Sequence, residues 1–343
     1  MTPEPPVGRS SWKRWAVTAV AVAIVVVAAQ AERSLLDRSV DALTHLRWGW
    51  VAAAIFFESA SMASFARMHR RVLRSGGLRL AISSVLAVTF AGNAISQSLP
   101  LAGSSVSAGF TYRQFSARGA GGTASAWVLA VAGIISSTAF ALIISAGAIH
   151  SGNPAAIAAG ATGAALTIIP LAALLVGLHH ARTRDWLIRL VVWTLRQSKR
   201  LIRRPAGDPL EIVRAAIANL GELRLSRRDA LIASIFSVTN WGFDIACLVC
   251  ALEAAGVSVP SKGIVLAWAA GAGAASLNLT PGGLGVVEAA LAAALVAIGV
   301  HSTPAMTSVL VYRLISFWLM LTVGWVVFWA IHRRAAVAPS PPA

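Results

Sequence analysis

The segment Thr280–Glu288, with the sequence TPGGLGVVE, interrupts a long apolar stretch with one proline and three glycines, and it ends in a carboxylate. Apolar residues dominate before it, from 262 to 279, and after it, up to 300. Proline and glycine break a helix, and backbone polar groups freed inside a bilayer must be satisfied by protein or by water. Irregular backbone at that depth is tolerated mainly where it lines a cavity, so this segment is a candidate working site.

The composition of the whole chain indicates an integral membrane protein. Of its 343 residues, 57% are hydrophobic and only 12% are charged, and the mean hydropathy is +0.72. The net charge of +16 does not indicate a nucleic-acid partner, because the basic residues lie between apolar runs and no nucleic-acid motif accompanies them. We expect an all-α, polytopic helical membrane protein that forms a single integral membrane domain over residues 1–343.

Six apolar segments approach the roughly 20 residues that an α-helix needs to cross a bilayer. These expected full spans are Trp15–Ala31, Trp48–Ala66, Thr123–Ile149, Ala156–Leu178, Ala230–Leu252 and Ala305–Ile331. The first of them ends in Ala29-Gln30-Ala31, which resembles a signal-peptidase site, so its cleavage is an alternative to a first span.

Lysine and arginine are distributed unevenly between the loops, and this bias orients membrane helices. Five arginines occur between 67 and 79 and twelve basic residues between 182 and 228, whereas the link near Gly152 carries no charge. We therefore expect the basic loops to be cytoplasmic. Basic residues precede the first span, and arginines follow the last one. We therefore expect both termini on the same, cytoplasmic side.

Two further apolar segments fit this charge distribution as re-entrant hairpins. If residues 80–110 enter from the cytoplasm and turn near Pro100, the arginines on both sides of the segment stay inside. By the same logic, residues 262–300 enter from the outer face and turn at Pro281–Gly283. Two broken segments in corresponding halves are typical of an inverted repeat with a binding site near the bilayer midplane. The alternative is that the two prolines only kink ordinary spans.

One sizeable polar segment, residues 179–229, connects the apolar spans before and after it. Apolar and basic residues alternate from Asp185 to Arg204 at a spacing that suits a helix lying on anionic lipid headgroups. Asp208-Pro209-Leu210-Glu211 resembles the N-terminus of a second helix. We expect a basic, amphipathic cytoplasmic connection, and the alternative is a basic loop that only sets the topology.

Polar side chains and glycines gather at both breaks, where unwound backbone and side-chain groups can line a wet pocket for a lipid headgroup. The candidate substrate-binding residues are Asn93, Gln97, Pro100 and Gly103 at the first break, and Asn278, Thr280, Pro281, Gly282, Gly283, Gly285, Glu288 and Arg313 at and after the second. The competing explanation for the polar side chains is interhelical hydrogen bonding, which contributes only about 1 kcal/mol per contact.

The ionisable residues within the apolar runs are Glu58, Asp244, Glu288 and Arg313, and such residues by default face a cavity or a partner. Glu288 follows the glycine break and Arg313 lies in the next span, so the two can pair. The guanidinium can also bind a phosphate through bidentate hydrogen bonds. A static buried ion pair is the alternative. Glu58 and Asp244 are weaker candidates for a functional role. Each side chain can snorkel to the interface or form a hydrogen bond with a neighbouring helix.

Motifs for soluble-enzyme chemistry are missing from the sequence. It contains no DxD, HExxH, Walker or GxSxG sequence, and its two cysteines, Cys247 and Cys250, lie in an apolar segment where thiols usually behave as small buried hydrophobes. We expect neither an enzyme, nor a metal site, nor a cofactor.

The string TPGGLGVVEAAL over 280–291, the Tyr312-Arg313 pair, and Asn93 with Pro100 and Gly103 resemble the lysylphosphatidylglycerol synthase transmembrane-region family of flippase-like integral membrane proteins. The resemblance covers nearly the whole chain. It implies a multi-pass protein of the bacterial inner (plasma) membrane that moves or holds a lipid, without the soluble aminoacyltransferase domain of the bifunctional members. Where many relatives carry a charged residue after the first-half glycine, this chain has Ser104 and Ser105.

The function expected from the resemblance is lipid translocation, or lipid-headgroup binding, in the bacterial envelope, with a midplane cavity lined by the two breaks. The expected partners are a phospholipid, glycolipid or polyprenyl lipid, and anionic headgroups at residues 182–228. Two alternatives stay open. One is a non-catalytic scaffold for envelope lipid enzymes that docks them at the same basic segment. The other is an intramembrane lipid transferase that uses Glu288 as a base and Arg313 to hold a phosphate.

Overall fold

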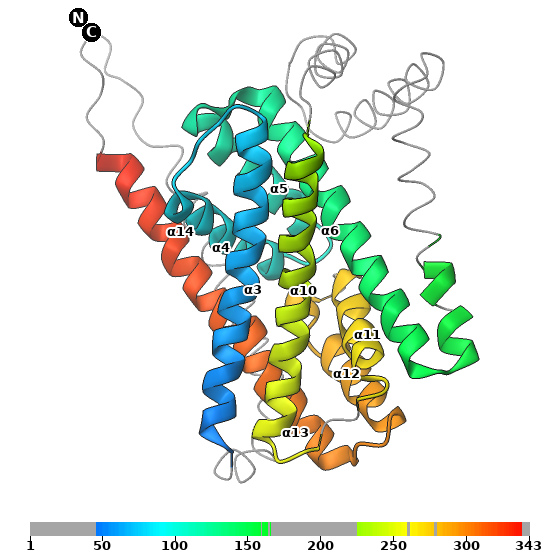
Figure 1. Cartoon of the computed structure of the whole chain (residues 1–343). Helices are drawn as coiled ribbons and strands as arrows, with labels where there is room; N and C mark the ends of the chain where they lie inside the picture. Colours follow the sequence, from blue (N-terminus) through cyan, green and yellow to red (C-terminus); the bar gives the residue numbers. More distant parts are fainter. Residues whose placement is uncertain are drawn as a thin grey trace, which may run out of the picture.

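A computed structural model describes residues 46–158, 160–163, 165, 225–258, 261–277 and 280–337 of the chain. Within these ranges the regular secondary structure is entirely helical (Figure 1). Four helical stretches among the described residues are long and apolar enough to cross a membrane: Trp48–Ser75, Gly103–Ser151, Arg227–Ala254 and Ser302–Arg333. The all-α, polytopic membrane fold expected from the sequence is confirmed.

These four stretches contain four of the six expected spans. The expected span Trp15–Ala31 lies outside the described residues, as do most of Ala156–Leu178 and most of the connection 179–229.

The described helices follow the same order of lengths twice, with a long helix, two short helices and then a long helical stretch. The first run comprises α3 (Trp48–Ser75), α4 (Ile82–Ser98), α5 (Gly103–Phe115) and α6 (Gly121–Ser151). The second run comprises α10 (Arg227–Ala254), α11 (Ile264–Ser276), α12 (Val286–Ala297), α13 (Ser302–Arg313) and α14 (Met320–Val337). Because the two runs begin with antiparallel helices, they have the arrangement expected of an inverted repeat.

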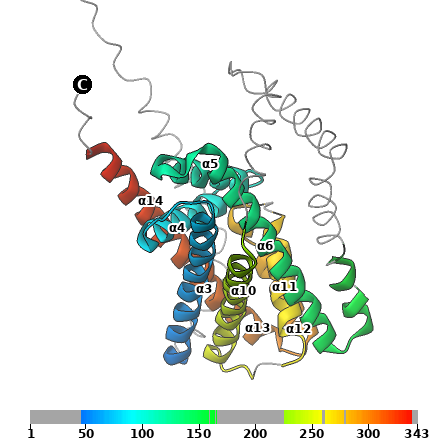
Figure 2. The same ribbon diagram turned by 45° about the horizontal axis from the view of Figure 1, so that its top comes forward.

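Helices α3 and α10 form the largest helix–helix interface of the described part and lie side by side at its centre (Figures 1 and 2). Near the middle, the Ser61 hydroxyl donates a hydrogen bond to the Asn240 side-chain oxygen at 3.1 Å. Ten residues further along α3, Arg71 forms an ion pair with Asp229, which lies eleven residues earlier on α10. The two contacts establish the antiparallel register of this pair.

The two segments expected as hairpins fold as helix–turn–helix units. Helices α4 and α5 pack together in the upper part of Figure 1, and α11 and α12 pack together in its lower part. The turn of the second unit is the short 3-10 segment Pro281–Gly283, and it contacts α4 of the first. The broken segments of the two halves therefore meet inside the bundle.

The last long stretch is not a uniform α-helix. Helix α13 ends at Arg313, and a π-helical segment, Leu314–Leu319, joins it to α14. Single turns of π-helix are found frequently at functional sites, because the wider turn changes the direction of the side chains that follow. Here the irregularity begins directly after the arginine that the sequence marked as a candidate.

Helix α14 packs closely on α4 because Gly324 has no side chain. A Cβ atom built at Gly324 would lie 2.4 Å from the Phe90 carbonyl oxygen and 2.7 Å from the Ala94 Cβ atom. Small residues allow membrane helices to approach in this way. This contact packs α14, at the end of the second half, against α4 in the hairpin of the first half.

The substitution Gly324→Ala should lower the free energy of unfolding by about 1–3 kcal/mol, because the added methyl group overpacks the α4–α14 contact. Thermal unfolding of the purified protein in detergent measures the change. Gly242→Ala in α10 is the matched control, since a Cβ atom there has nothing within 4 Å. It should be neutral or slightly stabilising through helix propensity. Equal effects of the two substitutions would contradict the close approach of α14 to α4.

Candidate functional site

A cavity of about 640 Å³, called here the central cavity, lies where the two broken segments meet the α3–α10 pair. Its walls also include α6, α13 and the π-helical segment after α13. Its polar lining comes from every one of these elements. The polar lining residues are Glu58, Ser61, Asn93, Ser96, Gln97, Ser136, Ser137, Asn240, Asp244, Ser276, Tyr312, Arg313 and Ser316.

Four of the candidate residues chosen from the sequence lie at this one cavity. Asn93 and Gln97 reach it from α4, Gly282 from the turn of the second hairpin, and Arg313 from the end of α13. Residues more than 200 positions apart in the chain thereby share a single volume. A polar cavity between apolar helices is the arrangement in which irregular membrane-embedded backbone is tolerated.

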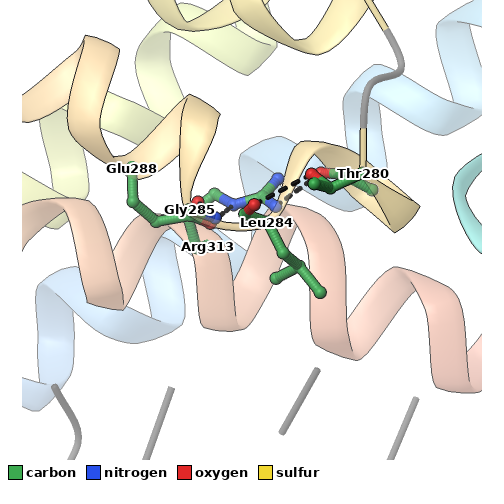
Figure 3. A network of polar contacts seen from close by, with 6 residues as sticks. Thr280, Leu284, Gly285, Glu288 and Arg313 are labelled. Atoms are coloured by element: carbon green, nitrogen blue, oxygen red, sulfur yellow. Dashed lines mark hydrogen bonds and ion pairs between the residues drawn. The ribbon is translucent and has the colours of Figure 1, made fainter. Parts of the chain in front are cut away.

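Glu288 and Arg313 form a buried ion pair that closes the second hairpin onto α13 (Figure 3). Their side chains are 2% and 7% exposed. The Arg313 Nε atom donates to Glu288 Oε1, and Arg313 Nη2 donates to the Gly282 carbonyl oxygen at 2.7 Å. The guanidinium also lies over the Phe317 ring, 4.5 Å from its centroid. One arginine thus connects the glycine break, the following helix and the π-helical segment.

The second oxygen of Glu288 caps its own helix. The backbone N–H of Gly285 donates to Glu288 Oε2 at 2.6 Å, at the start of α12. A carboxylate at a helix N-terminus satisfies a free N–H group and interacts favourably with the helix dipole. Both oxygens of Glu288 are therefore occupied by donors. We call this set of contacts, made by Gly282, Gly285, Glu288 and Arg313, the clasp.

The glycines of the break are required by the backbone. Gly282, Gly283 and Gly285 have φ values of 60°, 69° and 80°, in the region that side chains disfavour. A Cβ atom at Gly282 would lie 1.9 Å from the Phe317 ring. Thr280 closes the same loop through its hydroxyl, which donates to the Leu284 carbonyl oxygen at 2.8 Å (Figure 3). These residues shape the loop that positions the clasp.

Thr280, Pro281, Gly283 and Gly285, although candidates for binding, do not line the central cavity. The same holds for Glu288, whose side chain is held within the clasp. Asn278 lies outside the described residues.

Close backbone packing also shapes the first break, between α4 and α5. A Cβ atom at Gly103 would lie 2.0 Å from the Ser96 carbonyl oxygen, so only glycine allows α5 to start this close to the end of α4. Between them, Leu101 has a φ of 57°, and the Ala102 N–H donates to the Pro100 carbonyl oxygen at 2.5 Å. Pro100 and Gly103 shape this turn and do not line the central cavity.

Asp244, given a weaker claim from the sequence, is tied into the cavity wall by two hydrogen bonds. The Tyr312 hydroxyl donates to Asp244 Oδ1 at 2.7 Å, and the Trp268 indole N–H donates to Oδ2 at 3.0 Å. Trp268 packs in turn against Trp241 and Phe140, with ring centroids 5.6 and 5.5 Å away. An aromatic wall therefore holds a carboxylate at the cavity surface.

Several lining residues were missed as binding candidates. Ser61 follows Glu58 by three positions in an apolar run, and Asn240 precedes Asp244 by four. Polar residues at these spacings share one face of a helix, which is the signal that could have identified the stripe. Ser136 and Ser137, in contrast, belong to a short Ser-Ser-Thr run in a long apolar helix, and only the folded arrangement of α6 brings them to the cavity.

A second cavity, of about 480 Å³, adjoins the first and is called here the α5-side cavity. The two share Asn93, Ser96, Ser136 and Ser137 in their linings. Hydroxyl-bearing residues of α5 extend the polar surface away from the centre: Ser104, Ser107 and Thr111. Polar side chains therefore lie along both cavities from the clasp to the first hairpin, among apolar ones such as Met62 and Phe65.

No group of three or more metal-ligating side chains occurs among the residues that the structure describes. Arg313 is the cation of the central cavity lining, and Glu58 and Asp244 are its carboxyl groups. The site therefore offers hydrogen-bonding side chains, one guanidinium and two carboxyls. It is suited to bind a polar group by hydrogen bonds and charge.

The Glu288–Arg313 pair should behave as a coupled unit in a double-mutant cycle. Glu288→Gln or Arg313→Gln alone leaves a buried charge unpaired and should cost about 3–5 kcal/mol of unfolding free energy. The double variant removes both charges, so its loss should be smaller than the sum by about 1–3 kcal/mol. Unfolding in detergent measures all three. Strictly additive losses would contradict a direct ion pair.

Gly282→Ala and Gly285→Ala should differ although both residues have positive φ. Each substitution should lower the free energy of unfolding by about 1–2 kcal/mol, because a residue with a side chain disfavours positive φ. Only the methyl group at Gly282 would collide with Phe317, whereas a Cβ atom at Gly285 has open space around it. The thermal midpoint should therefore fall further for Gly282→Ala. An equal fall would show that the loop does not pack against the π-helical segment.

Comparisons with known proteins show the family of the chain. Residues 15–324 match the family described as lysylphosphatidylglycerol synthase TM region. The chain is also 30% identical over 104 residues to a UPF0104 membrane protein of Pyrococcus horikoshii, a match that covers 30% of this chain and 31% of the relative. The chain thus matches about a third of the length of that curated relative. Because the family match extends over most of the chain, the resemblance is confirmed, and the protein belongs to the lysylphosphatidylglycerol synthase transmembrane-region family.

Proposed function

We propose that this protein moves a membrane lipid between leaflets, with the polar headgroup passing through the central cavity. The observation that carries the proposal is the continuity of the two cavities, whose shared lining contains polar side chains among apolar ones. Their shared lining joins the turn of the second hairpin to the hydroxyl groups of the first. A headgroup that follows this surface would avoid the hydrocarbon, where an unpaired polar group costs several kcal/mol.

The proposed orientation follows from the charges at the helix ends. The C-terminal ends of α3 and α14 and the N-terminal end of α10 lie at the same end of the bundle (Figure 1). These ends carry basic residues: Arg70, Arg71, Arg74, Arg227, Arg228 and Arg333. We place this end in the cytoplasm by the positive-inside rule. The first hairpin then enters from the cytoplasm and the second from outside, in the plasma membrane of a bacterium.

Within this proposal Arg313 has two roles. Its Nε and Nη2 atoms hold the clasp, and the residue also lines the central cavity. A guanidinium has five N–H donors, so it can hold the loop and still donate to a phosphate. The substrate class is a lipid with a polar, phosphate-bearing headgroup. Anionic lipid at the basic connection 182–228 is a further proposed partner.

We do not propose catalysis. Glu288 was the candidate base for a transferase, but Gly285 N–H and Arg313 occupy both of its oxygens. A general base must lie within hydrogen-bond reach of the proton that it abstracts, and Glu288 does not line the central cavity. A scaffold for envelope enzymes makes a different prediction from lipid movement. Substitutions within the cavity would leave the function of a scaffold unchanged.

The test is the rate at which a fluorescent phospholipid crosses the membrane of liposomes that contain the protein. An impermeant reductant bleaches the outer leaflet, and the remaining decay reports the movement of the inner lipid. Asn93→Trp should slow this decay at least about tenfold, or about 1.4 kcal/mol of barrier, because Asn93 lies where the two cavities join.

Leu142→Trp is the matched control, since it introduces the same bulky side chain at a position of α6 that is 54% exposed. Its rate should equal that of the unchanged protein. Equal rates for both tryptophan variants, or no acceleration by the unchanged protein with any phosphate-bearing lipid probe, would refute the proposal. A scaffold would give that result.

A further inference from the structure

Two carboxyl groups of the central cavity take no part in the clasp. Glu58 lies on α3 and Asp244 on α10. The hydrogen bond from Ser61 to Asn240 sets the register of these antiparallel helices. Glu58 lies one turn before Ser61, and Asp244 lies one turn after Asn240, so the two carboxyls occupy opposing positions across the interface. Both line the cavity.

The two carboxyls have different partners. Each oxygen of Asp244 accepts one hydrogen bond, from Tyr312 and from Trp268. Two fixed donors on its two oxygens match an ionised carboxylate, which only accepts. Glu58, in contrast, is only 6% exposed, and its Oε2 atom has no hydrogen-bond partner among the described residues. A buried polar atom without a hydrogen-bond partner is uncommon and needs a physical explanation.

The single cation among the described residues of the cavity lining cannot neutralise all the carboxyl groups near it. Arg313 is held by Glu288, so one positive charge already faces one negative charge within the clasp. Asp244 adds a second negative charge, and an ionised Glu58 would add a third. An isolated ionised carboxylate in an apolar interior is costly, and such a group takes up a proton instead.

The titratable groups near Glu58 in the described part of the chain come from α10 and α13. Helix α10 contributes Asp244 and Cys247, whose thiol is hydrogen-bonded to the Glu58 carboxyl group, and α13 contributes Tyr312 and Arg313, which line the same cavity. Helices α4 and α11 contain no titratable residue within their described bounds, and α6 contains only His150, in its last turn. No basic group other than Arg313 is placed to neutralise Glu58 in the cavity lining.

A proton suits this site better than a metal ion. Both oxygens of Asp244 are already hydrogen-bonded, and no cluster of three or more metal-ligating side chains exists within the described ranges. Hard cations such as Mg²⁺ and Ca²⁺ need six or more oxygen ligands. A proton needs a single oxygen with a free lone pair, which Glu58 Oε2 provides.

We propose that Glu58 and Asp244 form a proton-binding pair in the central cavity, in which Glu58 carries one proton at neutral pH while Asp244 stays ionised. The pair titrates as one unit, because each charge depends on the other. Entry of a cationic group or of water into the cavity would release the proton. This site goes beyond the proposed lipid movement and does not depend on it.

Modification by dicyclohexylcarbodiimide, an apolar reagent that adds to protonated carboxyl groups, tests the pair in the full-length protein in liposomes. At about pH 7 an ordinary glutamate is ionised and does not react. Peptide mass spectrometry should show modified Glu58 and no modified Glu253, which lies near the end of the same α10 helix as Asp244 and outside the cavity.

Asp244→Asn should reduce the modification of Glu58 at about pH 7 at least about threefold, because a neighbouring negative charge favours the protonated form of a carboxyl. Glu253→Gln is the matched control and should leave it unchanged. Modification of Glu58 that does not respond to Asp244→Asn would overturn the pair. A thermal unfolding curve for each variant confirms that it is folded.

Infrared spectroscopy removes the dependence on reagent access. The spectrum at about pH 7 should contain the carbonyl band of a protonated carboxyl, and Glu58→Gln should remove it, because an amide has no such band. If Glu58 is unmodified and the band is also missing from the unchanged protein, Glu58 is ionised and the proposal is wrong. Lipid movement can fail in its own assay without affecting either measurement.

Discussion

The bond from Arg313 to the Gly282 carbonyl oxygen is the interaction on which the central site depends. A chain that unwinds among apolar helices must find partners for its backbone within the protein, because hydrocarbon supplies none. Arg313 supplies a donor to the loop, Glu288 neutralises the arginine, and the Gly285 N–H completes the arrangement. The same arginine lies over Phe317, the ring against which Gly282 packs. Loop, charge pair and π-helical segment therefore form one cooperative unit.

The cavity exists because two hairpins of similar build approach each other across the α3–α10 pair. Each has short helices that end inside the bundle, at Ser98 in α4 and at Ser276 in α11. Short helices cannot fill the length of the bundle, and the space beyond their ends is lined by amides and hydroxyls. Close contacts such as that of Gly324 with α4 hold the walls together. The two hairpins thus place polar side chains in the interior of the bundle.

The sequence predicted the helical elements well, whereas the binding roles of individual residues stay predictions. Apolar runs and the glycine break were enough to expect the helical membrane fold and the second hairpin segment, since these depend on local composition. The pairing of Glu288 with Arg313 was also expected, because few ionisable residues lie in the apolar runs. Gly103, Thr280 and Pro281 were expected to bind substrate, and the structure places them in turns outside the lining of the central cavity. Glycine is needed both for close ligand approach and for tight turns, so its presence alone does not distinguish the two.

The sequence by itself determined that this chain is an all-α membrane protein of its family, broken at Thr280–Glu288, because hydropathy and helix-breaking residues act locally. Only the tertiary structure decided which polar side chains share a cavity. Ser136, Asn93 and Asp244 come from three different helices, and their spacing along the chain carries no information on their separation in space. Helix packing sets that separation, through the antiparallel register of α3 and α10 and the approach of the two hairpins.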